Sequence, residues 1–313
     1  MSPSPLIDVR SITAEEVDRF AGFADPRIRL QLSEAWSNGS SRPEWTLLAE
    51  SEGRVIARGA LITAPMGGGV STLEGTAAFL WADPDHPRHA EAFRAIIDAL
   101  ADRLAPHGPT TLDRRLNLET HSDIDRLRPL LLASGFTLFQ EKIGFAWTPA
   151  VPVPAAPTVL RLVAYAELGH DGFRQVMAAT TAATLDRNDR YYIARCGPEP
   201  WADEIMSSMD DGDQRSWLIG FHGAEPAGFV GVSAFDDHTW TIAHIGVVPT
   251  HRGHGHVSEL LAAADRAARE RGFSTGLSDV DVDNAQMVSA MQRAGHRSDL
   301  RPWHIWHYRR HVG

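Results

Sequence analysis

The sequence contains one cysteine, one lysine and no long hydrophobic run. Cys196 stands alone, so no intramolecular disulfide can form, and we expect a protein of a reducing, cytoplasmic compartment. No segment approaches the roughly 20 consecutive apolar residues that a membrane-spanning helix needs. The first eight residues also lack a basic region followed by an apolar stretch. We therefore expect no membrane partner and no targeting segment.

Positive charge comes almost entirely from arginine, and the formal net charge is -10. The chain has no Lys/Arg block of the kind that follows a phosphate backbone, so we expect no nucleic-acid partner. A negatively charged protein attracts cations over a long range, which favours an amine as the small-molecule substrate.

A length of 313 residues favours two domains, because a single hydrophobic core stops growing before that length. Residues 148–157 read TPAVPVPAAP. Prolines at this density remove backbone donors and favour an extended chain. We therefore predict domains at residues 1–149 and 158–313, joined by a Pro/Ala linker at residues 150–157.

The second half shows helical text, strands with β-branched and aromatic residues, and Gly-containing stops in a defined order. The predicted elements are a helix at 166–184, a polar aromatic loop at 186–192, a short helix at 201–209, strands at 216–220, 227–235 and 239–248, a helix from 257, a strand at 275–282, a helix at 284–294 and a last strand at 303–308. The first half repeats this order in outline, which indicates a duplicated fold. We predict the α/β (α+β) class, with a mixed, mainly antiparallel sheet flanked by helices in each domain.

The stretch from Ile245 to Ala264 has the features of an anion-binding turn. A strand ends at Pro249, Gly253 and Gly255 permit positive φ, and a helix begins at once. Several backbone N–H groups then point at one spot, where the helix dipole and Arg252 add positive charge. Such a spot suits a diphosphate group.

The pattern strand-Val-x-Pro-x-x-Arg-Gly-x-Gly-helix resembles the acetyl-CoA signature of the GNAT superfamily of N-acetyltransferases. The later stretch 279–284, followed by Met287, Met291 and Gly295, is similar to the second block of that family, where an asparagine starts a helix. The chain as a whole resembles tandem members of the superfamily. The resemblance implies acetyl-CoA (coenzyme A) as co-substrate, held by Val247, Val248, Arg252, Gly253, His254, Gly255, His256, Val257 and Asn284.

Several positions depart from the family pattern. Val257 stands where Gly or Ala is usual, Met291 where a tyrosine often protonates the departing thiolate, and Thr241 where a glutamate base is common. Because a thiolate is a good leaving group, water can protonate it instead. In the first half, residues 82–89 have no glycine, two prolines and two aspartates. We expect the first half to be a degenerate copy that helps to shape the substrate cleft or supports the second half.

The residues proposed for catalysis are His244, Tyr192 and Asp281. His244, on the strand before the turn, has a near-neutral pKa that suits a general base, or it is a partly buried, hydrogen-bonded strand residue. Asp279 and Asp281 share one face of a strand and either bind a cationic acceptor or are solvated. Tyr192 lies in the loop that in this superfamily closes over the acceptor, and a packing role is the alternative.

No metal site is expected, because His251, His254 and His256 do not form a His-x-x-x-His pair on one helix face. Two functions remain open. The first is an acetyl-CoA-dependent N-acetyltransferase that acts on a primary amine of a small molecule by direct attack in a ternary complex. The second is a non-catalytic acyl-CoA-binding or sensor protein, which Met291 and Thr241 favour. The sequence leaves the acceptor, the acyl length and the oligomeric state open.

Overall fold

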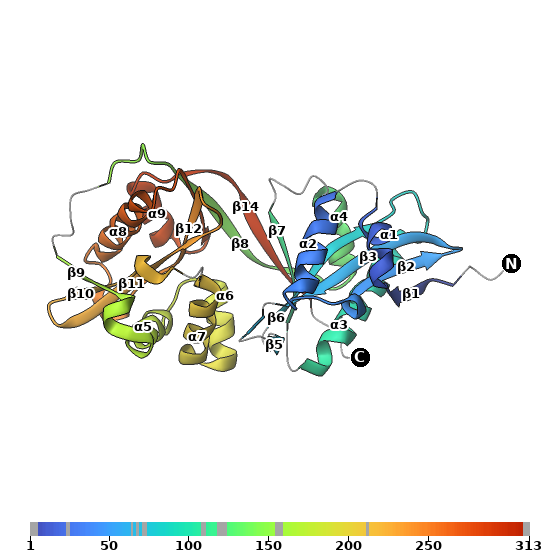
Figure 1. Cartoon of the computed structure of the whole chain (residues 1–313), viewed down its shortest axis with the longest axis horizontal. Helices are drawn as coiled ribbons and strands as arrows, with labels where there is room; N and C mark the ends of the chain where they lie inside the picture. The colour runs from blue at the N-terminus through green and yellow to red at the C-terminus, as the bar shows by residue number, and fades with distance from the viewer. Residues whose placement is uncertain are drawn as a thin grey trace. The chain divides into compact units, whose positions relative to one another are not determined.

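The computed structural model describes residues 6–22, 26–63, 65–66, 69–70, 74–107, 111–117, 124–153, 159–210 and 213–308. The chain forms two compact units (Figure 1). Unit 1 comprises Met1–Phe139 and His304–Gly313, and unit 2 comprises Gln140–Trp303. Each unit has a mixed, mainly antiparallel sheet with helices packed on it, so the predicted fold class is confirmed.

Unit 1 contains a sheet in the order β1-β2-β3-β6-β7-β14, with a parallel pair at β6–β7. Its strands and helices are β1 (Asp8–Ser11), α1 (Val17–Ala21), α2 (Pro26–Ser37), β2 (Thr46–Ser51), β3 (Arg54–Ile62), β6 (Glu74–Ala82), α3 (His89–Leu104), β7 (Thr111–Asn117), α4 (Ile124–Ala133) and the ends of β8 (Phe136–Trp147) and β14 (Arg297–Tyr308). The short strands β4 (Pro65–Met66) and β5 (Gly69–Val70) pair only with each other in the described part of the chain.

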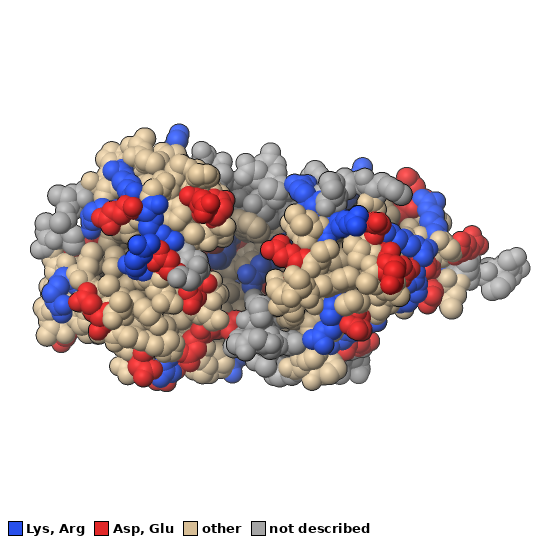
Figure 2. All heavy atoms as spheres, viewed as in Figure 1, with Lys and Arg blue, Asp and Glu red and all other residues tan. Residues whose placement is uncertain are grey.

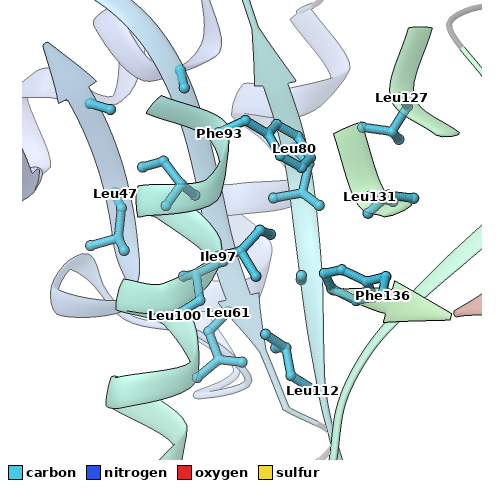
Figure 3. Packing of buried hydrophobic residues seen from close by; sticks show 14 of the residues in the cluster. Leu47, Leu61, Leu80, Phe93, Ile97, Leu100, Leu112, Leu127, Leu131 and Phe136 are labelled. Carbon is cyan, nitrogen blue, oxygen red and sulfur yellow. The ribbon is translucent and has the colours of Figure 1, made fainter. Parts of the chain in front are cut away.

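Alternation along β2 divides the buried residues of unit 1 between two faces of the sheet. Leu47 belongs to the cluster under α3, together with Phe93 and Ile97 of that helix (Figure 3). Leu48, the next residue, belongs to a second cluster with Phe20 and Leu32 of α1 and α2. Helices therefore cover both faces of this sheet.

Unit 2 contains a sheet in the order β8-β13-β12-β11-β10-β9, in which β12 and β13 are parallel. Its elements are β9 (Arg161–Ala164), α5 (Tyr165–Thr181), α6 (Arg187–Cys196), α7 (Pro198–Met209), β10 (Trp217–His222), β11 (Glu225–Ala234), β12 (Thr239–Val247), α8 (His256–Glu270), β13 (Thr275–Asp281) and α9 (Ala285–Arg293).

The two faces of β11 carry different helices (Figure 1). Phe229 contacts Phe173 of α5, with ring centroids 5.7 Å apart. Val230 and Val232 point the other way and pack in the cluster that contains Leu260 of α8. Because α5 and α8 cover opposite faces, the end of β12 is approached by the C-terminus of α5 and by the N-terminus of α8.

The unit boundaries differ from the predicted division at residues 150–157, of which 154–157 lie outside the described residues. Residues 142–147 of β8 pair with β13, and Phe145 and Trp147 are buried in the core of unit 2. Trp306, near the end of the chain, is buried in the core of unit 1. Burial of these large aromatic side chains, rather than the prolines, decides which unit each terminal strand joins.

The polar stretch predicted as a loop at residues 186–192 is mostly helical. Asp186 is the N-cap of α6, and its side chain accepts hydrogen bonds from the backbone N–H groups of Asn188 and Asp189. Satisfying these donors stabilises the first turn of a helix that is rich in polar and charged residues. The sequence reading missed this cap, and the tyrosines therefore lie on a helix.

No helix among the described residues is long and apolar enough to cross a membrane. On the face that Figure 2 shows, basic and acidic side chains are mixed over both units, and the described residues there form no continuous basic stripe.

Candidate functional site

The glycine turn after β12 presents an open backbone surface. Gly253 and Gly255 have φ of 83° and 79°, a left-handed conformation that disfavours side chains. A Cβ built on either glycine meets no described atom within 4 Å. Gly255 is also the N-cap of α8, so the first turn of the helix has no capping side chain in front of it. Backbone N–H groups and the helix dipole here favour an anion.

A cavity of about 140 Å³ lies against this turn. Of the residues proposed from the sequence, eight line it: His244, Val247, Arg252, Gly253, Gly255, His256, Val257 and Asn284. Residues that sequence reasoning did not propose complete the lining: Thr180, Thr181, Thr184, Leu185, Ile245, Gly246, His251, Gln286 and Met287. The structure thus brings the proposed cofactor turn and His244 into one cavity.

The threonines of the lining come from the C-terminal end of α5 and the residues after it. Thr180 approaches β12 closely, because a Cβ on Gly246 would lie 2.9 Å from the Thr180 Cβ. Glycine at position 246 therefore permits the contact between helix and strand. A signal was present in the sequence, since hydroxyl residues recur at 180, 181 and 184 within the otherwise apolar stretch 176–185.

Arg252 connects α5 to β12 through backbone carbonyls. Its Nε donates to the Val247 carbonyl at 3.0 Å, and its Nη atoms donate to the carbonyls of Ala183 at 2.8 Å and Thr180 at 3.3 Å. Three of the five guanidinium donors are thus used within the protein. Burial lowers the Arg252 pKa, but an arginine remains charged at neutral pH. Arg252 therefore supplies positive charge and fixes the walls of the cavity.

His244 has a buried carboxylate behind its imidazole. Its Nε2 lies 3.4 Å from Oδ2 of Asp189, which is 5% exposed. Asp189 also accepts hydrogen bonds at 3.1 Å from Trp201 Nε1 and from Thr184 Oγ1. Burial by itself would lower the His244 pKa, but the charge of Asp189 and its hydrogen bond raise that pKa above the ordinary value. This imidazole is oriented and made more basic.

Further charges surround this pair in unit 2. Lys142, the single lysine, lies 2.6 Å from Asp279 and 4.0 Å from Asp186. Burial by itself would lower the Lys142 pKa, but the charges of these two aspartates raise it. Burial raises the Asp186 pKa, while the charge of Lys142 opposes that shift. Asp279 is therefore an ion-pair partner of Lys142.

Asp281 and Tyr192 do not line the cavity. Asp281 is 2% exposed and accepts hydrogen bonds from Gln140 Nε2 at 2.9 Å, from the Arg187 N–H at 2.7 Å and from the Asp283 N–H at 2.9 Å. Tyr192 is fully buried, and its ring stacks on Trp201 with centroids 4.7 Å apart. These contacts give both side chains structural roles in the present conformation.

Two of the residues predicted to hold the cofactor, Val248 and His254, also lie outside the cavity lining. The Val248 N–H donates to the Ala227 carbonyl at 2.8 Å, so this amide serves the sheet. In the second block, Asn284 caps α9 by accepting from the Met287 N–H at 3.2 Å. Met291 is 1% exposed and packs in the core of unit 2, away from the cavity.

Unit 1 has no comparable glycine turn at residues 82–89. Asp83 forms an ion pair with Arg54 and accepts from the Asp85 N–H at 3.1 Å. A separate cavity of about 650 Å³ lies in unit 1 and has five arginines in its lining: Arg27, Arg58, Arg114, Arg115 and Arg126. The two copies have therefore diverged at the position of the cofactor turn.

Comparison with known proteins agrees with this geometry. The model of the acetyltransferase (GNAT) family matches residues 168–296, which contain the cavity. A comparison with curated proteins found no match.

Solved structures give the fold of the whole chain. A GCN5-related N-acetyltransferase from Sphaerobacter thermophilus is 14% identical, with 96% of this chain and 95% of that chain covered at a TM-score of 0.62. A tandem GNAT protein from the clavulanic acid biosynthesis pathway is 16% identical, with 96% and 98% covered at a TM-score of 0.56. A glucosamine N-acetyltransferase region of a fungal multi-domain protein is 11% identical, with 98% and 38% covered at a TM-score of 0.58. The family model thus assigns residues 168–296, within unit 2, to the acetyltransferase (GNAT) family, and the likenesses to solved structures show that the chain has the fold of these proteins.

Proposed function

We propose that unit 2 transfers the acetyl group of acetyl-CoA to a primary amine of a small molecule, by direct attack in a ternary complex. One observation carries this proposal: a single cavity contains the open glycine turn, the start of α8 and His244 with Asp189 behind it. The turn supplies anion binding and the histidine supplies a base.

The cofactor turn is proposed to hold the diphosphate through the backbone N–H groups of residues 253–257. The left-handed glycines keep this surface free of side chains. Arg252 contributes charge and holds α5 against β12, and Asn284 holds the start of α9 at the cavity. The side chains of Val247 and Val257 supply apolar contact.

Acetyl-CoA would supply an acyl group activated as a thioester. In our proposal His244 takes the proton of the bound ammonium, so that the nitrogen lone pair becomes available for attack on the carbonyl carbon. Asp189 keeps the imidazole oriented and stabilises its protonated form, as the carboxylate does in other His–Asp pairs. The Val247 N–H is proposed to polarise the carbonyl, and water protonates the departing thiolate.

A cationic amine fits the charges around His244. The charges of Asp189 and Asp186 act on the imidazole, and Lys142, which pairs with Asp186 and Asp279, offsets only part of them. Among proteins of similar fold, one region is described as a glucosamine N-acetyltransferase, so amino sugars belong in a substrate panel.

The test is release of CoA from acetyl-CoA in the presence of polyamines, amino acids, aminoglycosides and glucosamine. We expect turnover with at least one amine, and a loss of about 10²-fold or more in kcat for His244→Gln. His238→Gln is the matched control, because His238 is an exposed histidine on the turn before β12. CoA binding without turnover by any amine would instead support the alternative of a non-catalytic acyl-CoA-binding protein.

A further inference from the structure

Three histidines from separate parts of unit 2 meet beside the cofactor turn. His222 ends β10, His251 belongs to the short helical turn after β12, and His256 begins α8. One ring nitrogen of each lies within 4.8 Å of one nitrogen of each of the others. His251 and His256 also line the cavity. No spacing rule predicts this cluster, because the β10–β11 hairpin contributes His222.

The separations suit a shared metal ion after small rotations of the side chains. Zinc–imidazole bonds of about 2.0–2.1 Å in a tetrahedral site place ligand nitrogens roughly 3.3 Å apart. Three histidine ligands with a fourth position left for water or another donor are a known arrangement for zinc. Since His222 is exposed, it can adjust, and an ion can reach the cluster from solvent.

His256 provides an independent observation. The residue is 4% exposed, and its Nε2 has no hydrogen-bond partner in the described part of the chain. A buried polar atom left without a partner costs about 1–3 kcal/mol, so such an atom calls for an explanation. An ion that accepts the lone pair of an imidazole nitrogen would satisfy it.

The immediate surroundings of His256 favour its neutral imidazole, which is the form that binds metal. Burial lowers the His256 pKa, and the neighbouring charges of His222, His251 and His254 lower it further. Glu225 lies 3.3 Å from Nε2 of His251 and adds the negative charge that often supports a metal-bound histidine.

We propose that His222, His251 and His256 bind one divalent transition-metal ion of the zinc class, with Glu225 as a supporting carboxylate. Imidazole ligands suit Zn²⁺, Co²⁺, Ni²⁺ and Cu²⁺, whereas Mg²⁺ and Ca²⁺ prefer oxygen ligands. The site therefore discriminates between these two groups of ions. It does not depend on the acetyltransferase proposal, because it needs neither acetyl-CoA nor an amine.

The test titrates Co²⁺ and Zn²⁺ separately into the untagged, chelator-treated full-length protein without acetyl-CoA, using calorimetry and, for Co²⁺, visible absorption. We expect one equivalent per chain at micromolar or tighter affinity, and no binding of Mg²⁺. His222→Ala should weaken binding at least 10²-fold, and Glu225→Gln about 10- to 100-fold. His254→Ala and His238→Ala are matched controls that should retain the affinity, since neither belongs to the cluster.

Circular dichroism of each variant checks its fold, and exposure of His222 makes misfolding of His222→Ala unexpected. Loss of CoA turnover alone would not affect this proposal, because metal binding is measured directly. Absence of stoichiometric binding, equal affinity in His222→Ala, or equal losses in His238→Ala and His222→Ala would each overturn it.

Discussion

Replacing Asp189 with asparagine separates the basicity of His244 from its position. Asparagine has nearly the same shape, and its carbonyl oxygen can still accept from Trp201 Nε1, which donates to Asp189 Oδ1 at 3.1 Å. The change removes the negative charge that lies 3.4 Å from His244 Nε2. Burial of the imidazole, which lowers its pKa, stays in place.

The magnitude follows from the separation of the two charges. Unit charges 3.4 Å apart attract by roughly 5 kcal/mol at an effective dielectric constant of about 20, and burial of both groups offsets part of this. With Asp189 present the balance favours the protonated imidazole, so the His244 pKa is raised. Without the carboxylate, burial dominates, and the His244 pKa should fall below its ordinary value of about 6.5.

A general base works in its neutral form, so the rate rises as pH passes upward through its pKa. For the wild-type protein we expect the midpoint of the acidic limb of kcat above about pH 6.5, and for Asp189→Asn below it. The plateau of kcat should also fall, because a weaker and less oriented base transfers the proton less well, but by less than in His244→Gln.

The assay is CoA release at saturating acetyl-CoA and amine between about pH 5 and 9, within which the ordinary histidine pKa lies. His238→Gln should leave the profile unchanged. If Asp189→Asn keeps the wild-type limb, the titrating group is not His244, and a base elsewhere or bulk water performs the deprotonation.

Other substitutions test the cofactor turn and the buried residues. Gly255→Asp should abolish CoA binding in calorimetry. Gly223→Asp, also at positive φ but in the β10–β11 turn, should carry a similar backbone strain of about 1–2 kcal/mol and should still bind CoA. Equal losses of CoA binding in both variants would contradict the assignment of the turn. Asp281→Asn should lower the free energy of unfolding by about 1–3 kcal/mol and leave the KM for the amine nearly unchanged. A raised KM at normal stability would instead indicate that Asp281 contacts the acceptor. Trp306→Ala should destabilise unit 1 by about 3–5 kcal/mol while CoA affinity persists, and destabilisation confined to unit 2 would refute the placement of the last strand.

The local features of the cofactor turn could be predicted because they depend on neighbouring residues. Positive φ at Gly253 and Gly255 and the start of α8 directly after them follow from short-range backbone preferences. The cap at Asn284 is equally local. Residues that lie close together in the chain with fixed conformations leave few alternatives for the backbone.

The partners of His244 could not be predicted in this way. Asp189 belongs to α6, and its approach to β12 depends on how the helices of unit 2 pack on the sheet. The sequence predicts a catalytic or acceptor-binding role for Asp281, because its side chain shares one face of a strand with Asp279. In the structure, the Asp281 carboxylate instead accepts hydrogen bonds from Gln140 Nε2 and from the Arg187 N–H. Alternation along a strand predicts a shared face, and it does not predict which groups from other elements occupy that face.

The unit that each of the terminal strands β8 and β14 joins could not be predicted either, because it also depends on tertiary packing. Both β8 and β14 are aromatic strands that close a repeat, so each has the composition to complete either core. Trp147 is buried with Trp240 in unit 2, their ring centroids 5.3 Å apart, whereas Trp306 is buried among the residues of unit 1. Two copies of one fold offer similar gaps for a last strand, and composition does not distinguish between them. Duplication therefore made the fold class predictable from the sequence and left the assignment of its last strands to tertiary packing.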